Sequence, residues 1–335
     1  MITDDLSVLQ GNRTTITQFI IVGFPGLQAE YYGLVSMSLF MIYITTVVGN
    51  SLLLLLYVRE QSLKKPMYII MLSLALSDIG FCTVALPKII AKYWFNSGAT
   101  PFHVCFMQKQ LIHYFGTLNS LIMMIMALDR YVAICYPFRY PVLITSRMVS
   151  LLNIVAWVVA MVAPTITTVH AYQLPYCGPN LIVHCYCDQI SITNLACADH
   201  SLQRMVAVAV ALFVLLFPLS FIVYTYTQII VTVVRIANMQ GRLKMFSTCS
   251  AQLSIIVIYF VPRSFVYLAS LINIKMSTDF RIILILFYSL FPPLINPFIY
   301  CIRTKEIRQV LAKWLRRQQP VEETTTQKPI AAIAT

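Results

Sequence analysis

Residues 34–56 read LVSMSLFMIYITTVVGNSLLLLL and contain no charged side chain. An α-helix rises about 1.5 Å per residue, so roughly 20 apolar residues cross the hydrocarbon core of a bilayer. The run 206–234 is also free of charged residues and is longer. These runs predict a protein that crosses a membrane.

The composition of the whole chain agrees. Of 335 residues, 59% are hydrophobic and 11% are charged, whereas a soluble domain carries about 25% charged residues. Backbone groups in lipid must bond within their own segment, which favours helices, and the runs lack the alternation of barrel strands. We expect an all-α membrane protein with seven transmembrane helices, at roughly 31–57, 67–91, 105–135, 147–170, 203–235, 246–271 and 280–301.

The distribution of basic residues predicts the orientation. The net charge is +12, and sixteen of the 24 Lys and Arg residues fall on one side if the N-terminus is outside. Basic residues collect on the cytoplasmic side of membrane proteins, so this charge indicates orientation and not a nucleic-acid partner. The one N-x-[ST] sequon, at Asn12, lies in the polar tail 1–30, where we expect an extracellular glycan.

The segment after the last span has a different pattern. In residues 302–317, apolar side chains recur near helical spacing with basic residues between them. This pattern predicts a short amphipathic eighth helix on the inner leaflet, in contact with membrane lipid. Residues 318–335 have the composition of a disordered tail. The predicted regions are therefore 1–30, 31–301, 302–317 and 318–335.

One charged pair stands at the predicted cytoplasmic end of the third span. The stretch Met126–Tyr140 reads MALDRYVAICYPFRY. Near water, the pair costs less than the ~2.5–3.5 kcal/mol of an Arg at the bilayer centre, and Arg130 alone would be explained as a positive anchor. The stretch resembles the Asp-Arg-Tyr motif of rhodopsin-like G protein-coupled receptors. It also matches all nine fixed positions of MA-x-DRYVAIC, the signature of odorant receptors.

Further motifs extend the resemblance over nearly the whole chain. They follow in the family's order, and GFPGL (23–27) with Pro262 resembles the class I, or fish-like, branch. The motifs are PMY (66–68), Leu74, Ala75 and Asp78, LPK (86–88), TYTQI (225–229), KMFSTC (244–249) and PLINPFIY (293–300). Three positions depart from the family: Met245 replaces an Ala, Gln252 replaces a His, and an aromatic pair reads Tyr259-Phe260 instead of Phe-Tyr.

The resemblance implies an odorant receptor in the plasma membrane, in the cilia of olfactory sensory neurons. A small-molecule odorant would bind in the outer half of the bundle, and a heterotrimeric stimulatory G protein of the olfactory type would bind inside. The Asp-Arg pair would serve as a bistable element. The implied switch residues are Asp129, Arg130, Tyr131, Tyr226, Asn296, Pro297 and Tyr300.

The resemblance also implies a polar cluster in the bundle core, made of Asn50, Asp78, Ser289 and Asn296. This cluster has two interpretations that do not exclude each other: a sodium site near Asp78, and a structural hydrogen-bond network. No other cofactor is expected.

The nine cysteines include five on the predicted outer side. The resemblance implies disulfides Cys105–Cys187 and Cys177–Cys197, which leaves Cys185 to compete with Cys187 or to stay free. The segment His184-Cys185-Tyr186-Cys187 raises the alternative of a metal site. A disulfide at Cys187 would leave too few ligands, so no metal site is expected.

Two spans supply candidate ligand contacts. His113, Gly116, Thr117 and Ser120 share one face of the third span, although His113 also fits a core histidine. Arg263 lies within the apolar run 253–271, where an intramembrane Arg indicates a functional site.

The Arg263 guanidinium could take a carboxylate by a bidentate contact. It could equally pair with an internal acid such as Asp188 or Asp279, or reach outward to the interface. Lys109 could add positive charge, and Phe260 and Tyr267 complete the candidate site.

Three other functions are alternatives to an odorant receptor. A receptor for a non-odorant ligand in another tissue fits the same motifs. A transporter or channel would show inverted repeats or several charges along one path, and the chain has neither. An enzyme is not expected, because the sequence has no G-x-S-x-G, H-E-x-x-H or phosphate-binding Gly loop.

Overall fold

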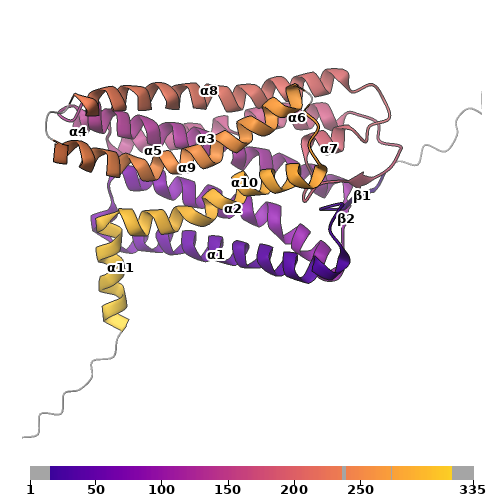
Figure 1. Cartoon of the computed structure of the whole chain (residues 1–335), viewed down its shortest axis with the longest axis horizontal. Helices are drawn as coiled ribbons and strands as arrows, with labels where there is room; N and C mark the ends of the chain where they lie inside the picture. Colours follow the sequence, from indigo (N-terminus) through magenta and orange to yellow (C-terminus); the bar gives the residue numbers. More distant parts are fainter. Residues whose placement is uncertain (1–15, 236–238, 273, 319–335) are drawn as a thin grey trace, which may run out of the picture.

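The computed structural model describes residues 16–235, 239–272 and 274–318. Within this part, seven helical segments are long and apolar enough to cross a membrane, and they lie side by side in one bundle (Figure 1). The glycosylation predicted at Asn12 and the tail 319–335 fall outside the described residues. The spans are α1 (Tyr32–Arg59), α2 (Pro66–Phe95), α3 (Phe102–Cys135), α5 (Ser146–Val159) with α6 (Val162–Tyr172), α8 (Ser201–Val234), α9 (Met239–Leu271) and α10 (Thr278–Arg303).

The fourth span is divided into α5 and α6. Pro164 lies in the first turn of α6 and has no N–H to donate to the carbonyl of Ala160, four residues earlier. The helix is therefore interrupted at residues 160–161, while the two pieces still cross the bundle as one segment.

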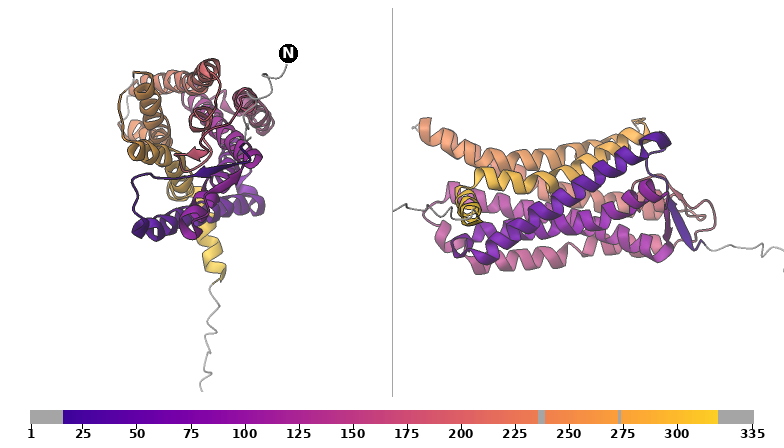
Figure 2. Two further views of the ribbon diagram at one scale, coloured as in Figure 1. Left: turned by 90° about the vertical axis from the view of Figure 1, so that its right-hand side faces the viewer. Right: turned by 90° about the horizontal axis from the view of Figure 1, so that it is seen from below.

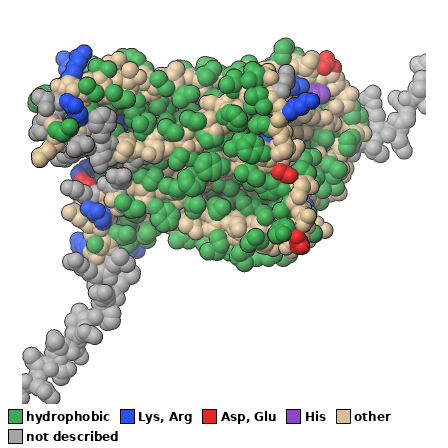
Figure 3. Space-filling model, in the orientation of Figure 1, with side chains coloured by type: hydrophobic (Ala, Val, Ile, Leu, Met, Phe, Trp, Pro, Cys, Tyr) green, Lys and Arg blue, Asp and Glu red, His purple; other side chains and the backbone are tan. Residues whose placement is uncertain are grey.

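The surface of the bundle matches a membrane environment. Hydrophobic side chains cover the middle of the face shown in Figure 3, and Lys and Arg gather toward its two ends. Large apolar residues such as Leu34, Val48 and Phe213 are more than half exposed on this surface. A soluble monomer rarely exposes so large an apolar area, so lipid is the medium that fits it.

The eighth helix, α11 (Lys305–Gln318), turns away from the direction of the spans at one end of the bundle (Figures 1 and 2). It begins later than the predicted residue 302, because Thr304 is extended and residues 302–303 continue α10. Ile307 and Val310 are buried against the bundle. The Trp314 indole donates to Glu60 at 2.8 Å, and Lys65 pairs with Glu306 at 3.3 Å.

A small sheet at the opposite end of the bundle was not predicted. It joins β1 (Gln18–Ile21), β2 (Ala99–Pro101) and β3 (Leu181–Ile182) in the order β2-β1-β3. β1 is antiparallel to β2 and parallel to β3, and Figure 2 (left) looks onto this end. Phe19 of β1 is fully buried against the rings of Phe102 and Tyr176. The segment predicted only as a tail therefore covers what we call the outer end.

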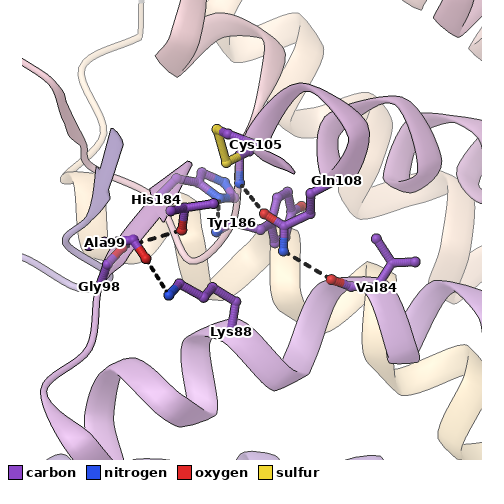
Figure 4. Close-up of a disulfide and its surroundings, with 10 residues drawn as sticks. Val84, Lys88, Gly98, Ala99, Cys105, Gln108, His184 and Tyr186 are labelled. Carbon is purple, nitrogen blue, oxygen red and sulfur yellow. Dashed lines mark hydrogen bonds between the residues drawn. A yellow bond between two sulfur atoms is a disulfide. The ribbon is translucent and has the colours of Figure 1, made fainter. Parts of the chain in front are cut away.

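Two disulfides hold the long loop at the outer end. Cys105 at the start of α3 bonds Cys187, and Cys177 bonds Cys197 within the loop; these are the pairs that the resemblance implies. Gln108 reinforces the first one, because its side chain accepts from the Cys187 N–H and donates to the Val84 carbonyl (Figure 4). Cys185 is free and buried. Among the described residues, no group of three His, Cys, Asp or Glu could hold a metal ion.

The shorter elements complete the chain. They are the 3-10 helices η1 (Ala29–Tyr31) and η2 (Gln61–Leu63) and the helices α4 (Tyr140–Leu143) and α7 (Gln189–Thr193). Helix α7 begins two residues after Cys187, so the disulfide to α3 anchors the start of this helix.

The contact of β1 with Gly98 gives a test of the outer sheet. A Cβ at Gly98 would lie 2.5 Å from the Ile21 carbonyl oxygen, closer than non-bonded atoms approach. Gly98→Ala should displace β1 and cost about 1–3 kcal/mol, measured as a lower unfolding temperature of the purified protein. In the same outer region, Gly178→Ala is the matched control, since its Cβ would meet nothing within 4 Å. Equal unfolding temperatures for the two variants would contradict the role of this contact.

Candidate functional site

Arg263 lies deep in the bundle on α9 and is 8% exposed. Its Nη1 donates to the Tyr259 hydroxyl at 2.8 Å and to the Ser120 hydroxyl at 3.4 Å. Among the described residues, no carboxylate lies within ion-pair distance of this guanidinium. Asp279 instead accepts from the Gly26 backbone N–H. The structure thus shows neither the internal ion pair nor the outward-reaching Arg263 that the sequence left open.

Aromatic rings complete the surroundings of this guanidinium. Its central carbon lies 5.5 Å from the Tyr259 ring centroid and 5.9 Å from that of Tyr267. A desolvated cation–π contact contributes about 2 kcal/mol, whereas a buried charge costs several kcal/mol unless an opposite charge is near. The site is therefore a buried cation whose described partners are neutral, and an anion would complete it.

Hydrogen bonds connect Arg263 to the predicted face of α3. The Tyr259 hydroxyl, which accepts from Arg263, donates to the Gly116 carbonyl at 2.6 Å. The Ser120 hydroxyl donates to the same carbonyl at 3.1 Å. The structure thus brings Gly116, Ser120 and Arg263 together through Tyr259. In the sequence, Tyr259 stands out only as part of an inverted aromatic pair, although it lies one helical turn from Arg263 and so shares its face.

The other predicted contact residues on α9 and α3 have different surroundings. Phe260 is almost fully buried and packs edge-to-face on Tyr259, so it supports that ring. Thr117 is buried and donates to the backbone carbonyl of His113. Lys109 is fully buried and donates to the Thr168 hydroxyl on α6 at 3.0 Å. Its charge is directed toward α6, and the structure does not bring it to Arg263 as the sequence suggested.

Unfilled space borders the same face of α3. A Cβ added at Gly116 would meet nothing within 4 Å. One turn further toward the outer end, the His113 side chain keeps 31% of its surface exposed. A close-packed interior has few such openings, so this face is suited to contact a ligand.

Asp188 faces His113 from the loop above. Its Oδ1 lies 3.9 Å from His113 Nε2, while its Oδ2 caps α7 by accepting from the Ile190 N–H at 3.1 Å. Burial alone would raise the pKa of Asp188, but His184, His113 and Arg281 hold that pKa below its usual value. Asp188 is therefore an ionised acceptor. It was considered from sequence only as a partner of Arg263.

Asp78 forms the predicted polar core with only some of its expected partners. It accepts from Asn296 at 2.7 Å and from Asn119 at 3.2 Å. Asn50 donates instead to the Pro293 carbonyl, and no hydrogen bond of Ser289 is found among the described residues. The side-chain oxygens of Asn119 and Asn296 are buried without a partner. Such oxygens suit a hard cation, so the residues present fit a sodium ion as well as a network.

At the opposite, inner end, Arg130 bridges three helices. Its Nε lies 3.9 Å from Asp129 and donates to Gln252 of α9 at 3.3 Å, and Nη2 contacts the Met67 sulfur of α2. Asp129 also accepts from the Tyr140 hydroxyl at 2.8 Å.

The other implied switch residues surround Arg130 less directly. Tyr226 and Tyr300 are buried, and their hydroxyls have no partner among the described residues. Pro297 packs against Gly49, where a Cβ would lie 3.1 Å from the proline ring. Tyr131 lies toward the surface and contacts Tyr136. The side chains of 243–248, which hold most of the KMFSTC motif, lie outside the described part.

Comparison with known proteins decides the family. The olfactory receptor family model matches residues 39–318. The chain belongs to the olfactory receptor family. Human olfactory receptor 2A12 is 33% identical over 93% of this chain and 99% of its own. Human olfactory receptor 10G7 is 35% identical over 90% of this chain and 96% of its own. Human olfactory receptor 52N2 is 33% identical over 91% of this chain and 95% of its own.

A solved structure supports the fold. Squid rhodopsin superposes with a TM-score of 0.68 over 89% of this chain and 91% of its own, at 16% sequence identity. The seven-helix, multi-pass fold predicted from the sequence is thus confirmed, and membership of the olfactory receptor family makes the protein a receptor and not an enzyme.

The space beside Gly116 generates a test of the ligand site. Gly116→Val should leave the amount of receptor at the cell surface unchanged, because its Cβ meets no atom. It should lower agonist potency at least tenfold, because the new methyl groups occupy the ligand's space. Concentration–response curves measure this, with Gly33→Val as the control because its Cβ also meets nothing within 4 Å. Unchanged potency in Gly116→Val would place the ligand elsewhere.

The contact between Arg130 and Gln252 generates a test of the switch. Gln252→Ala should raise ligand-independent signalling severalfold, because it removes a hydrogen bond that joins the inner ends of α3 and α9. Gln252→His, which restores the residue common in the family, should stay close to wild type. Basal cAMP normalised to surface receptor measures the effect, and equal basal signals in Gln252→Ala and wild type would contradict it.

Proposed function

We propose that this olfactory receptor detects a small odorant that carries a carboxylate, which binds the guanidinium of Arg263. One observation carries the proposal: a buried Arg whose described partners are hydroxyl groups and aromatic rings. A carboxylate would supply the missing charge through two parallel hydrogen bonds. The proposal is also supported at neighbouring Gly116, where an added Cβ would meet no atom within 4 Å.

Binding at Arg263 would reach the switch through Tyr259. The ligand carboxylate competes with the Tyr259 hydroxyl for the guanidinium, and Tyr259 is the residue that links α9 to the Gly116 carbonyl of α3. A ligand that loosens this link favours the state in which the inner ends of α3 and α9 separate. At that end, the same two helices are joined by Arg130 and Gln252.

The signalling partner is proposed from the family. A stimulatory G protein of the olfactory type would bind near Arg130, Tyr226 and the basic inner loops. The receptor would act in the plasma membrane of olfactory cilia, with α11 on the lipid of the inner leaflet. The class I assignment rests on the GFPGL segment and Pro262 and remains a prediction.

A cAMP assay in cells that express the receptor with an olfactory G protein tests the carboxylate proposal. Short-chain acids would be compared with their methyl esters and matched amines. We expect activation by acids alone and a loss of potency of about 100-fold or more in Arg263→Ala, since two hydrogen bonds to charged groups contribute about 1.5–3 kcal/mol each. Arg263→Lys keeps the charge without the planar fork and should lose less.

Surface labelling must show that each variant reaches the membrane. An unchanged acid response in Arg263→Ala would give Arg263 a structural role and leave the family assignment intact. Activation by the esters, or no response to any acid, would contradict a carboxylate ligand.

A further inference from the structure

A second polar group lies on the ligand face at a fixed distance from Arg263. Ser120, which accepts from Arg263, and His113, which faces Asp188, both lie on α3. Seven residues separate them, so they are two turns and about 10 Å apart along the helix. A ligand anchored at Arg263 and extending outward therefore reaches the pair of His113 and Asp188.

This pair has hydrogen-bonding capacity that the protein leaves unused. His113 Nε2 is buried and has no hydrogen-bond partner among the described residues. Asp188 uses Oδ2 for the cap of α7, while Oδ1 faces His113 at 3.9 Å, too far for a direct hydrogen bond. Unpaired buried polar groups cost free energy, so a group that bonds both atoms would be stabilised here.

A hydroxyl is the group that fits both partners. It donates one hydrogen bond, to Asp188 Oδ1, and accepts one, from the Nε2–H group of the His113 ring. A carboxylate at this end would be repelled by the Asp188 carboxylate, whose pKa is held below its usual value. An ammonium could bond Asp188 but could not accept a hydrogen bond from His113. A methyl end would leave both polar atoms unpaired.

We propose that the preferred ligands of this receptor are ω-hydroxy acids, with the carboxylate at Arg263 and the terminal hydroxyl between His113 and Asp188. The proposal rests on the carboxylate anchor at Arg263 proposed above. Allowing for a hydrogen bond at each end, the separation along α3 fits a chain of about four to six carbons. Neither the Arg263 anchor nor the pair of His113 and Asp188 gives this preference alone, because each of them would bind many simpler molecules.

The test compares ligands that differ only at one end. Hexanoate, 6-hydroxyhexanoate, 6-aminohexanoate, adipate and 1-hexanol would be applied to the full-length receptor in the cAMP assay. We expect 6-hydroxyhexanoate to be about tenfold more potent than hexanoate. 1-Hexanol should be the weakest, and adipate and 6-aminohexanoate should not exceed hexanoate.

Variants then assign the preference to the two residues. His113→Phe should abolish the advantage of 6-hydroxyhexanoate over hexanoate while hexanoate still acts. Asp188→Asn should reduce it, and because Asn is also a good N-cap, α7 should be retained. His103→Phe is the matched control, since His103 lies on the same helix, is exposed and contacts Tyr172; it should keep the full preference.

The outcomes separate this proposal from the one on which it rests. Equal potency of hexanoate and 6-hydroxyhexanoate, both dependent on Arg263, would overturn the hydroxyl site and leave the carboxylate anchor. The hydroxyl site would also be overturned if both His113→Phe and Asp188→Asn, at normal surface level, still preferred 6-hydroxyhexanoate to hexanoate. No response to either acid would overturn both proposals. If one variant fails to reach the surface, the other decides.

Discussion

The guanidinium of Arg263 is held inside an apolar helix bundle with only neutral described partners. Such a charge is tolerated because the Tyr259 and Ser120 hydroxyls accept its hydrogen bonds and two tyrosine rings face it. The Tyr259 and Ser120 hydroxyls belong to contacts between α9 and α3. The hydrogen bonds of one charged residue therefore link two helices, and the proposed ligand would act on this link.

The outer end makes the second half of the ligand site possible. The Cys105–Cys187 disulfide ties the loop to the start of α3, and Asp188 is the next residue after that cysteine. The carboxylate that caps α7 is thus held over His113 by a covalent bond and by the Gln108 bridge. Over this loop, β1 adds a layer that excludes water from the aromatic cluster around Phe19. The polar pair of His113 and Asp188 therefore has a geometry determined by the fold.

The bundle was predictable because a chain in lipid must satisfy its backbone hydrogen bonds internally. A charge-free run of this length must be helical, and the expected spans agree with the helices to within a few residues except where a helix extends past the lipid-sized run. The strand β1 was not predictable, since four residues carry too weak a pattern and pair with segments about 80 and 160 residues away.

Within the site, residue types were easier to predict than partners. An Arg in an apolar run can be recognised from the sequence as a candidate functional residue. Whether its side chain contacts Asp188 or Tyr259 depends on the rotation of α9 against α3. The direction of Lys109 depends in the same way on α6, which supplies Thr168. Such contacts join segments from 59 to 143 residues apart, and spacing along one helix carries no information about them.

The most direct measurement is the distance between the ligand and Arg263 in the bound receptor. Solid-state NMR dipolar recoupling on receptor with ¹⁵N-labelled arginine and carboxyl-¹³C hexanoate would measure it. We expect the carboxyl carbon about 4 Å from a guanidinium nitrogen, as in a bidentate pair, and no such coupling in Arg263→Lys. Saturating ligand with no carbon–nitrogen coupling in the wild-type receptor would contradict the anchoring of a carboxylate by Arg263.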